Sequence, residues 1–244
     1  VAPSAAESAS HIRLSASPSA APSAAESASH IRLSASPSAA ESATVHFVQA
    51  DVFDFIRSHQ AQSADLLIAH AFLDLLPLPD SLTALFSLLQ PRGLAWLTIN
   101  FDGVTSIEPA FRLVGTEDTV LSPPTAETVD ALIERLYHQT MDTRPSGGDS
   151  RTGRHLFGHI KQSGGEIIAA GASDWIVHPL NGQYPAEEAY FLQFILHFFE
   201  SALSNHPELD PRLLQAWLKQ RRAQIERAEL IYIAHQIDFL IRRC

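Results

Sequence analysis

The sequence predicts an α/β protein built around a mainly parallel sheet. From residue 44 to residue 103, short strand-type segments alternate with helix-type segments, a spacing typical of parallel α/β folds. Two of the predicted strands, residues 65–70 and 94–100, are continuous apolar runs, which is typical of strands covered on both faces. Hydrophobic residues make up 45% of the 244 positions and charged residues 18%, which is sufficient for a sizeable core.

The first elements follow in order from residue 45. VHFVQA, residues 45–50, is a short β-rich run, and after Asp51 the pattern predicts a helix over residues 53–59. DLLIAH, residues 65–70, is the next predicted strand.

The pattern continues with one more helix and strand. Ser81 is a good N-cap for a helix over residues 82–89, and Pro91-Arg92-Gly93 is expected to end it. LAWLTIN, residues 94–100, is a buried strand, and Phe101-Asp102-Gly103 is expected to turn the chain.

The second half is mainly helical. Apolar residues at helical spacing predict a helix over residues 125–141, and a polar loop follows at 144–154. A helix over residues 152–162 is expected to end at Gly164-Gly165. Residues 166–170 and 173–178 indicate strands.

The C-terminal part contains two longer helices. Residues 187–205 are apolar almost all round, but Gln193 and His197 interrupt them, so a buried helix is favoured over a membrane span. Asp210-Pro211 begins a helix expected to reach about residue 228. Residues 230–241 predict a final strand, with continued helix as the alternative.

Charge and cysteine content limit the partners and the compartment. Lys and Arg number 17 against 27 Asp and Glu, a formal charge of −10, which argues against binding to nucleic acid or to an anionic membrane surface. Cys244 is the single cysteine, so we expect no disulfide framework. The chain shows neither a signal-peptide pattern nor a run of about 18 apolar residues. We therefore expect a soluble cytoplasmic protein.

Residues 1–43 differ in composition from the rest. Ala, Ser and Pro make up 31 of these 43 positions, and the 19 residues at 2–20 recur unchanged at 21–39. Such a segment offers too few large apolar groups to offset its ordering entropy, roughly 1–2 kcal/mol per residue, which predicts a flexible tail. The alternative is that each HIRLSAS copy forms a short strand, because apolar and polar residues alternate there.

The segments HFVQADVFDF, ADLLIAHAFLDLLP and LFSLLQPRGLAWLTINFDG resemble the third, fourth and fifth strand regions of class I S-adenosylmethionine-dependent methyltransferases. This resemblance is good over residues 45–103 and loose from there to the C-terminus. It implies a Rossmann-like methyltransferase sheet in a domain at residues 44–244, with a helical insertion at about 117–163 and a largely helical C-terminal part. It also implies methyl transfer from S-adenosylmethionine to an acceptor, which we expect to be a small molecule.

The resemblance assigns five cofactor-binding residues. An acidic residue after the third strand receives the adenine amino group in this family, which corresponds to Asp51, with Val52 and Phe53 flanking the ring. The loop after the fourth strand passes the methionine end of the cofactor, which corresponds to His70 and Ala71. For Asp51 the alternative is an ordinary loop carboxylate that caps the following helix.

The sequence departs from the family at the glycine-rich turn after the first strand. All 11 glycines lie at Gly93 or later, so no such turn precedes the third-strand region, and no ribose-binding acid is recognisable there. Three explanations remain: the repeat supplies substitute strands, the sheet is incomplete, or the residues before Thr44 are not native to this domain. The competing function is accordingly a methyltransferase-like, non-enzymatic scaffold or partner-binding module that has lost its cofactor.

Other candidate sites carry weaker signals. His155 and His159 have the spacing of two metal ligands on a helix, but packing or solvation is favoured, and we predict no metal site. Arg151 and Arg154 are candidates to bind a substrate carboxylate, the alternative being a solvated loop. No catalytic residue is assigned, since Ser106 and Ser173 lack the sharp glycine-flanked turn of a catalytic serine. Trp175 and Tyr184 are interpreted as core edges, the alternative being a pocket mouth. The pairs Arg221-Arg222 and Arg242-Arg243 are interpreted as a helix face and a tail end.

Overall fold

The computed structural model describes residues 30–33, 43–112, 128–145 and 147–244, and the chain divides into two units at Asp51 and Val52. In the first unit, β1 (His30–Leu33) pairs antiparallel with β2 (Ala43–His46), and Ile31 lies opposite Val45. The strand alternative for HIRLSAS therefore holds for the four residues of β1. The flexible tail expected at residues 1–43 falls mostly on positions outside the described residues.

The sequence expectation for residues 45–50 is wrong in its pairing. The strand β2 ends at His46, and the residues after it have no regular structure up to Asp51. Its partner is β1 rather than a strand of the main sheet. A short β-rich run cannot by itself specify its partner, because pairing depends on which edge is available.

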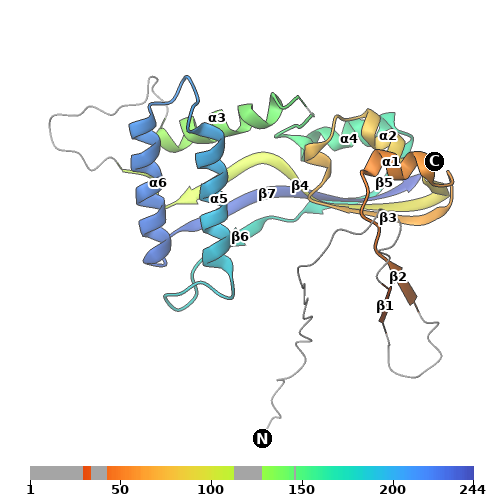
Figure 1. Cartoon of the computed structure of the whole chain (residues 1–244), viewed down its shortest axis with the longest axis horizontal. Helices are drawn as coiled ribbons and strands as arrows, with labels where there is room; N and C mark the ends of the chain where they lie inside the picture. The colour runs from red at the N-terminus through yellow and green to blue at the C-terminus, as the bar shows by residue number, and fades with distance from the viewer. Residues whose placement is uncertain (1–29, 34–42, 113–127, 146) are drawn as a thin grey trace, which may run out of the picture. The chain divides into compact units, whose positions relative to one another are not determined.

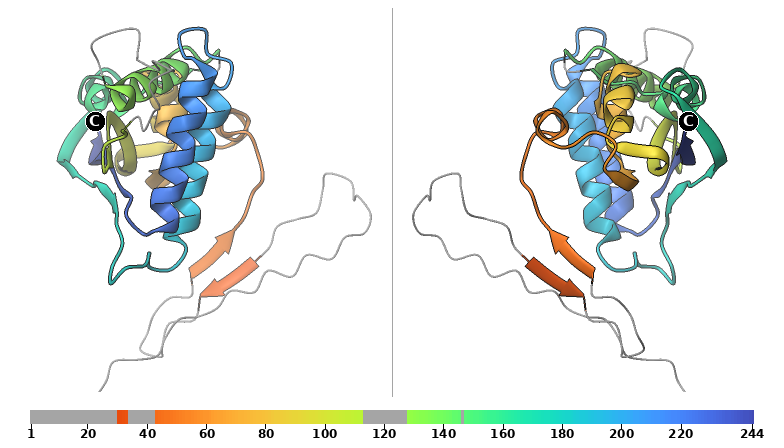
Figure 2. Two further views of the ribbon diagram at one scale, coloured as in Figure 1. Left: turned by 90° about the vertical axis from the view of Figure 1, so that its left-hand side faces the viewer. Right: turned by 90° about the vertical axis from the view of Figure 1, so that its right-hand side faces the viewer.

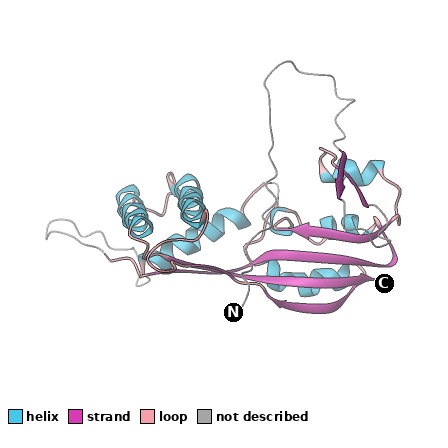
Figure 3. Ribbon diagram, turned by 90° about the horizontal axis from the view of Figure 1, so that it is seen from below, coloured by secondary structure: helices cyan, strands magenta, loops and turns pink. Residues whose placement is uncertain are grey.

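The second unit contains a mixed sheet in the strand order β3 (Ala64–His70), β4 (Leu89–Glu108), β7 (Ile231–Arg243) and β5 (Gly165–Ala172) (Figure 3). The short strand β6 (Trp175–Val177) also pairs with β7. Only the β3–β4 pair is parallel, because β7 runs antiparallel to β4, β5 and β6. The α/β class is thus confirmed, and the mainly parallel sheet is corrected to a mixed one.

The strand β4 is longer than the sequence predicts. Pro91, Arg92 and Gly93 lie within it instead of ending a helix, and Phe101-Asp102-Gly103 continues it instead of turning the chain. Gly103 adopts a positive φ of 71°, close to register shifts in the β4–β7 pairing. The turn residues therefore produce an irregularity in the strand, because β7 is long enough to pair with β4 on both sides of it.

Two short helices flank the first part of the sheet. The helix α1 (Val52–Ser58) follows the predicted position closely, and α2 covers Asp80–Phe86, joined to β3 through a 3-10 turn at Leu73–Leu75. Ser81 does not cap α2 as expected. It lies inside the helix, and its hydroxyl donates to the carbonyl of Pro77 at 2.7 Å.

The four remaining helices match the apolar periodicity of the sequence. They are α3 (Val129–Asp142), α4 (Thr152–Gln162), α5 (Glu188–Leu203) and α6 (Pro211–Glu226). Thr128 caps α3 by accepting from the Ala131 N–H at 3.2 Å, and Asp210 caps α6 by accepting from the Arg212 N–H at 2.8 Å. The final strand, β7, is confirmed over the alternative of continued helix.

One hydrophobic cluster joins the sheet to α2 and α4, which lie on the same side of it (Figure 1). Leu82 and Phe86 of α2 and Ile160 of α4 are buried against Leu97 of β4 and Ile241 of β7. Gly165 lies within this contact, because a Cβ there would be 2.9 Å from side-chain atoms of Phe86, Ile160 and Ile241. This face of the sheet is closed by helices, as expected for an α/β protein.

The opposite face of the same strands is bare, which corrects the expectation that residues 65–70 and 94–100 are covered on both faces. Ile68 of β3 is 50% exposed and lies opposite Trp96 of β4, which is 47% exposed. Leu66 and Ile168 are exposed as well. The described residues place no helix over this face. Buried residues such as Ala69, Ala95 and Leu97 therefore alternate with the exposed Ile68 and Trp96 along these strands.

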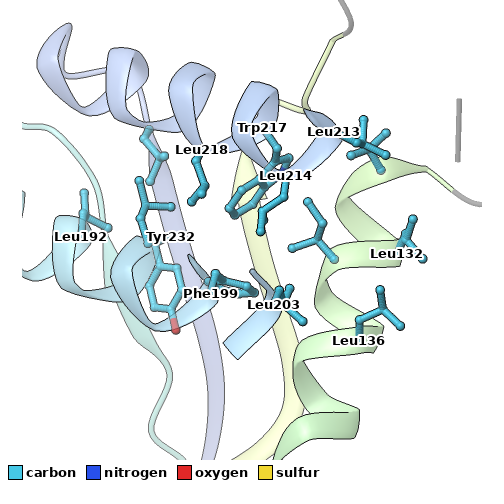
Figure 4. Packing of buried hydrophobic residues seen from close by; sticks show 14 of the residues in the cluster. Leu132, Leu136, Leu192, Phe199, Leu203, Leu213, Leu214, Trp217, Leu218 and Tyr232 are labelled. Carbon is cyan, nitrogen blue, oxygen red and sulfur yellow. The ribbon is translucent and has the colours of Figure 1, made fainter. Parts of the chain in front are cut away.

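A second cluster packs α3, α5 and α6 against the other end of β4 and β7 (Figure 4). Trp217 of α6, Phe199 of α5 and Leu132 of α3 are buried there together with Tyr232 of β7. The helices α5 and α6 run side by side in both views of Figure 2. This cluster forms one wall of the hollows described below.

The helix α5 is only half buried, which corrects the expectation of a buried helix. Leu192, Leu196 and Phe199 face the cluster, whereas Tyr190, Phe194 and Phe198 are exposed on its other side. No helix among the described residues is both long enough and apolar enough to cross a membrane.

Candidate functional site

Three of the five predicted cofactor residues lie at the start of α1. Asp51 is exposed and is the last residue of the first unit, whereas Val52 and Phe53 form the first turn of the helix in the second unit. Val52 is half-buried and packs against the cluster around α2 and α4. A packing role therefore accounts for Val52 without a ligand.

The other two predicted residues, His70 and Ala71, lie where β3 ends. The His70 ring nitrogen Nδ1 hydrogen-bonds the hydroxyl of Thr98 on β4, and the Ala71 N–H donates to the Thr98 carbonyl at 3.0 Å. Both residues are exposed, and Ala71 has a positive φ of 47°. These two hydrogen bonds connect the end of β3 to β4, so both residues have a structural role.

None of the five residues lines any of the hollows described below. An S-adenosylmethionine site also needs a close approach of backbone to ribose and methionine, which glycine permits, and residues 1–92 contain no glycine. The cofactor role of the five residues therefore stays a prediction.

Three hollows adjoin one another between β4 and α3. The inner one has a volume of about 120 Å³, the middle one about 260 Å³ and the outer one about 500 Å³. Thr105 of β4 lines the inner and middle hollows, while Ala131 and Glu134 of α3 line the middle and outer ones. Because the lining residues are shared, we treat the three hollows as one candidate site.

The inner hollow is mainly aromatic and contains one carboxylate. Phe101 and Tyr232 come from neighbouring strands, and Tyr137 and Phe199 from two helices, with the Tyr137 and Phe199 rings 4.3 Å apart. The lining residues are Asp74, Phe101, Thr105, Tyr137, Met141, Ile195, Phe199 and Tyr232. Walls from this many elements hold the rings in fixed positions.

The titratable groups of the inner hollow have shifted pKa values. Burial raises the pKa of Asp74 above its ordinary value, against the smaller opposing effect of a backbone hydrogen bond and of the nearby Arg144 charge. Burial likewise raises the pKa of the Tyr137 and Tyr232 hydroxyls, so both stay protonated at neutral pH. Shifted values that gather around a hollow are typical of a binding or active site.

The outer hollow is polar and open. Glu134 accepts from the Thr105 N–H at 2.9 Å, and burial raises its pKa. Asp142 accepts from the Ser150 N–H at 2.7 Å and from its hydroxyl at 3.2 Å. Burial lowers the pKa of His138, whose ring lies 5.3 Å from that of Phe101. This combination offers hydrogen-bonding groups to a polar part of a ligand.

Arg151 and Arg154 have different roles. Arg151 is exposed and lines the outer hollow. Arg154 binds Asp102 of β4 instead of being free for a substrate carboxylate, with its Nε 2.9 Å from Oδ1 and its Nη2 2.9 Å from Oδ2. This ion pair joins α4 to β4 near the positive-φ Gly103, and it occupies the guanidinium that the sequence offered as a candidate for a substrate carboxylate.

The structure gives His155 a carboxylate partner. The Nδ1 of His155 is 2.6 Å from Oδ2 of Asp149, and the two histidine rings lie 6.3 Å apart. Among the described residues, no three His, Cys, Asp or Glu side chains are placed to hold a metal ion. His155 is exposed on α4, and His159 is half-buried.

The buried network around Arg221 was not expected from the sequence. Its side chain is fully buried, pairs with Asp130 of α3, and donates to the Pro109 carbonyl and to Oε1 of Gln224. Asp130 also accepts from Nε1 of Trp217 at 2.6 Å. Arg221 therefore lies on the buried face of α6 and connects this helix to α3.

The sequence analysis missed the main residues of the site, namely Asp74, Glu134, Tyr137, His138 and Tyr232. A usable signal existed for Asp74, because it stands between apolar residues in AFLDLLP directly after a predicted strand. The others lie on α3 and β7, which are far apart in the sequence, so their meeting depends on the tertiary fold.

The comparisons with known proteins show only a distant structural similarity. No family model matches the chain, and no curated protein matches it by sequence. Among solved structures, the [4+2]-cyclase SpnF aligns at 12% identity over 76% of this chain and 53% of its own, with a TM-score of 0.30. The MccD protein aligns at 7% identity over 80% and 66%, with a TM-score of 0.31.

A phosphoethanolamine N-methyltransferase 2 of Haemonchus contortus, solved with S-adenosylhomocysteine, aligns at 14% identity over 75% of this chain and 34% of its own, with a TM-score of 0.31. The chain thus spans about half the length of the first of these structures. The similarity is distant: this is a mixed α/β protein that weakly resembles structures with the methyltransferase fold.

Proposed function

We propose that this chain is a small-molecule-binding module with a methyltransferase-like fold, which binds its ligand between β4 and α3 and does not hold S-adenosylmethionine by itself. The observation that carries the proposal is the set of three adjoining hollows around Thr105 and Glu134, with shifted pKa values at their walls. Concave sites with a few convergent polar groups are the usual places of ligand binding.

The contacts of the predicted cofactor residues support the second part of the proposal. Among the described residues, His70 and Ala71 are bonded to Thr98 of β4, and the given sequence has no glycine before Gly93 to permit a close approach of backbone to a ligand. We expect S-adenosylmethionine to bind with a dissociation constant of roughly 1 mM or weaker.

Binding of a ligand can be tested with a set of small neutral, acidic and amine fragments by ligand-observed NMR. Ala131→Trp should block the middle and outer hollows, because Ala131 is exposed and lines both. Ala61→Trp, at an exposed turn, is the matched control. We expect fragment signals that Ala131→Trp weakens and Ala61→Trp retains. Equal signals in both variants, or none in the unmodified chain, would contradict the proposal.

Methyl transfer is the second candidate function, favoured by the sequence resemblance over residues 45–103. It requires cofactor binding, so calorimetry with S-adenosylmethionine separates the two candidates. Micromolar affinity would favour the methyltransferase and remove the second part of our proposal, whereas millimolar or weaker affinity would support it.

A further inference from the structure

The inner hollow combines aromatic walls with a single carboxylate. Phe101, Tyr137, Phe199 and Tyr232 supply the rings, and Asp74 supplies the charge. Figure 4 shows Phe199 and Tyr232 next to each other, below α6. Aromatic faces carry a negative potential that attracts organic cations, and ring-lined pockets are a common means of binding ammonium groups.

The charge of Asp74 is poorly compensated within the described part of the chain. Its Oδ1 is buried and has no hydrogen-bond partner there, and no ion pair joins the carboxylate to a described cation. Arg144 is the cation that acts on it, and the effect of burial is larger. Glu134 adds a second negative charge that acts on Tyr232. A buried carboxylate oxygen without a partner is costly, and a bound cation beside Oδ1 would relieve that cost.

The volume limits the size of the ligand group. At about 120 Å³ the hollow is somewhat smaller than an apolar cavity of about 150 Å³ that is able to bind benzene. A group of four or five heavy atoms fits this space, and the rest of a larger molecule can extend past Thr105 into the middle hollow. A metal ion is a poor match, because these walls offer rings rather than several oxygen or nitrogen ligands.

We propose that the inner hollow binds an organic ammonium group, with Asp74 as its counter-ion and the four aromatic rings as its walls. This inference rests on the proposed function and names the ligand class for the same site. The positive group supplies the partner that Oδ1 of Asp74 lacks, and its methyl or methylene groups contact the ring faces.

Two matched probes test the charge. Trimethylammonium, the form of trimethylamine at neutral pH, and tert-butanol have nearly the same shape but differ in charge. We expect trimethylammonium to bind at least tenfold more tightly than tert-butanol by ligand-observed NMR titration. Asp74→Asn should remove this preference while keeping the volume of the side chain, and Asp80→Asn, an equal charge change at the exposed start of α2, should retain it.

A second variant, Tyr137→Leu, tests the aromatic wall. It should weaken the binding of trimethylammonium more than the binding of tert-butanol, because only the cation is attracted electrostatically to the face of the ring. The thermal midpoint of each variant shows whether it folds, and Asp74→Asn is expected to fold because it removes a buried charge.

The outcomes separate this inference from the proposed function. If both probes bind equally, or if only neutral fragments bind, the ammonium inference is overturned and small-molecule binding stands. If the preference survives in Asp74→Asn, the role of Asp74 is overturned. If no probe or fragment binds, the proposed function is lost together with the inference.

Discussion

The ion pair of the buried Arg221 with the partly exposed Asp130 should be essential for the stability of the packing between α3 and α6. The Arg221 side chain has no exposed surface, and its guanidinium lies 5.3 Å from the Trp217 ring. Asp130→Asn keeps the shape of the side chain and an acceptor for Nε1 of Trp217, but it leaves the buried guanidinium without a countercharge. Breaking one side of a buried ion pair typically costs about 3–5 kcal/mol.

This loss of unfolding free energy is large compared with the total stability of a domain. For a chain of this size each kcal/mol shifts the thermal midpoint by about 2–4 °C, so Asp130→Asn should lower it by roughly 10 °C. Urea unfolding followed by tryptophan fluorescence measures the loss of free energy directly. Glu229→Gln is the control, because it breaks the exposed pair with Arg227 and should leave the midpoint within error.

A double variant separates the missing countercharge from general damage to packing. Arg221→Met combined with Asp130→Asn removes both charges, and it should recover much of the stability that Asp130→Asn alone loses. A loss below about 1 kcal/mol for Asp130→Asn, or no recovery in the double variant, would refute the reasoning.

Three further predictions concern other parts of the chain. Because burial raises the pKa of Asp74 above 3.8, the folded chain retains a proton that the unfolded chain has lost, so stability falls as pH rises through this window. Asp74→Asn should therefore gain stability relative to the unmodified chain as pH rises above the ordinary pKa of aspartate, and a constant difference in urea titrations would contradict this. Removing residues 1–43 should change the unfolding free energy by under about 1 kcal/mol, because the main sheet pairs within Val52–Cys244, and loss of a cooperative transition would show the opposite. Ile68→Lys should slow heat-induced aggregation with little change in midpoint, because Ile68 is 50% exposed beside Trp96 on a bare sheet face, and unchanged light scattering would count against it.

The sequence alone predicted the elements well where periodicity and end signals agree. Helix α4 lies at the predicted residues, and α6 begins at Pro211 with Asp210 as its cap. The final strand, β7, was also predicted, because its β-branched and aromatic residues fit a pleated surface. These features depend on neighbouring residues, which is why local reasoning was sufficient for them.

Local signals failed where a distant partner decided the outcome. The segment Phe101-Asp102-Gly103 has the composition of a turn, but pairing with β7 keeps it in a strand. Ser81 has the chemistry of a cap, but the helix begins at Asp80 and the Ser81 hydroxyl binds the Pro77 carbonyl. Such outcomes follow from strand pairing and helix packing, whose energies exceed local preferences of about 1 kcal/mol.

The sequence by itself determined the class of the fold, most of its helices and the lack of a glycine-rich cofactor turn. Only the tertiary structure decided where the site lies, because the hollows bring together Asp74 after β3, Tyr137 on α3, Phe199 on α5 and Tyr232 on β7. Because these residues are far apart in the sequence, no local pattern predicts that they lie close together. Burial then fixes their chemistry, since it raises the pKa of Asp74 and of both tyrosines by removing them from water.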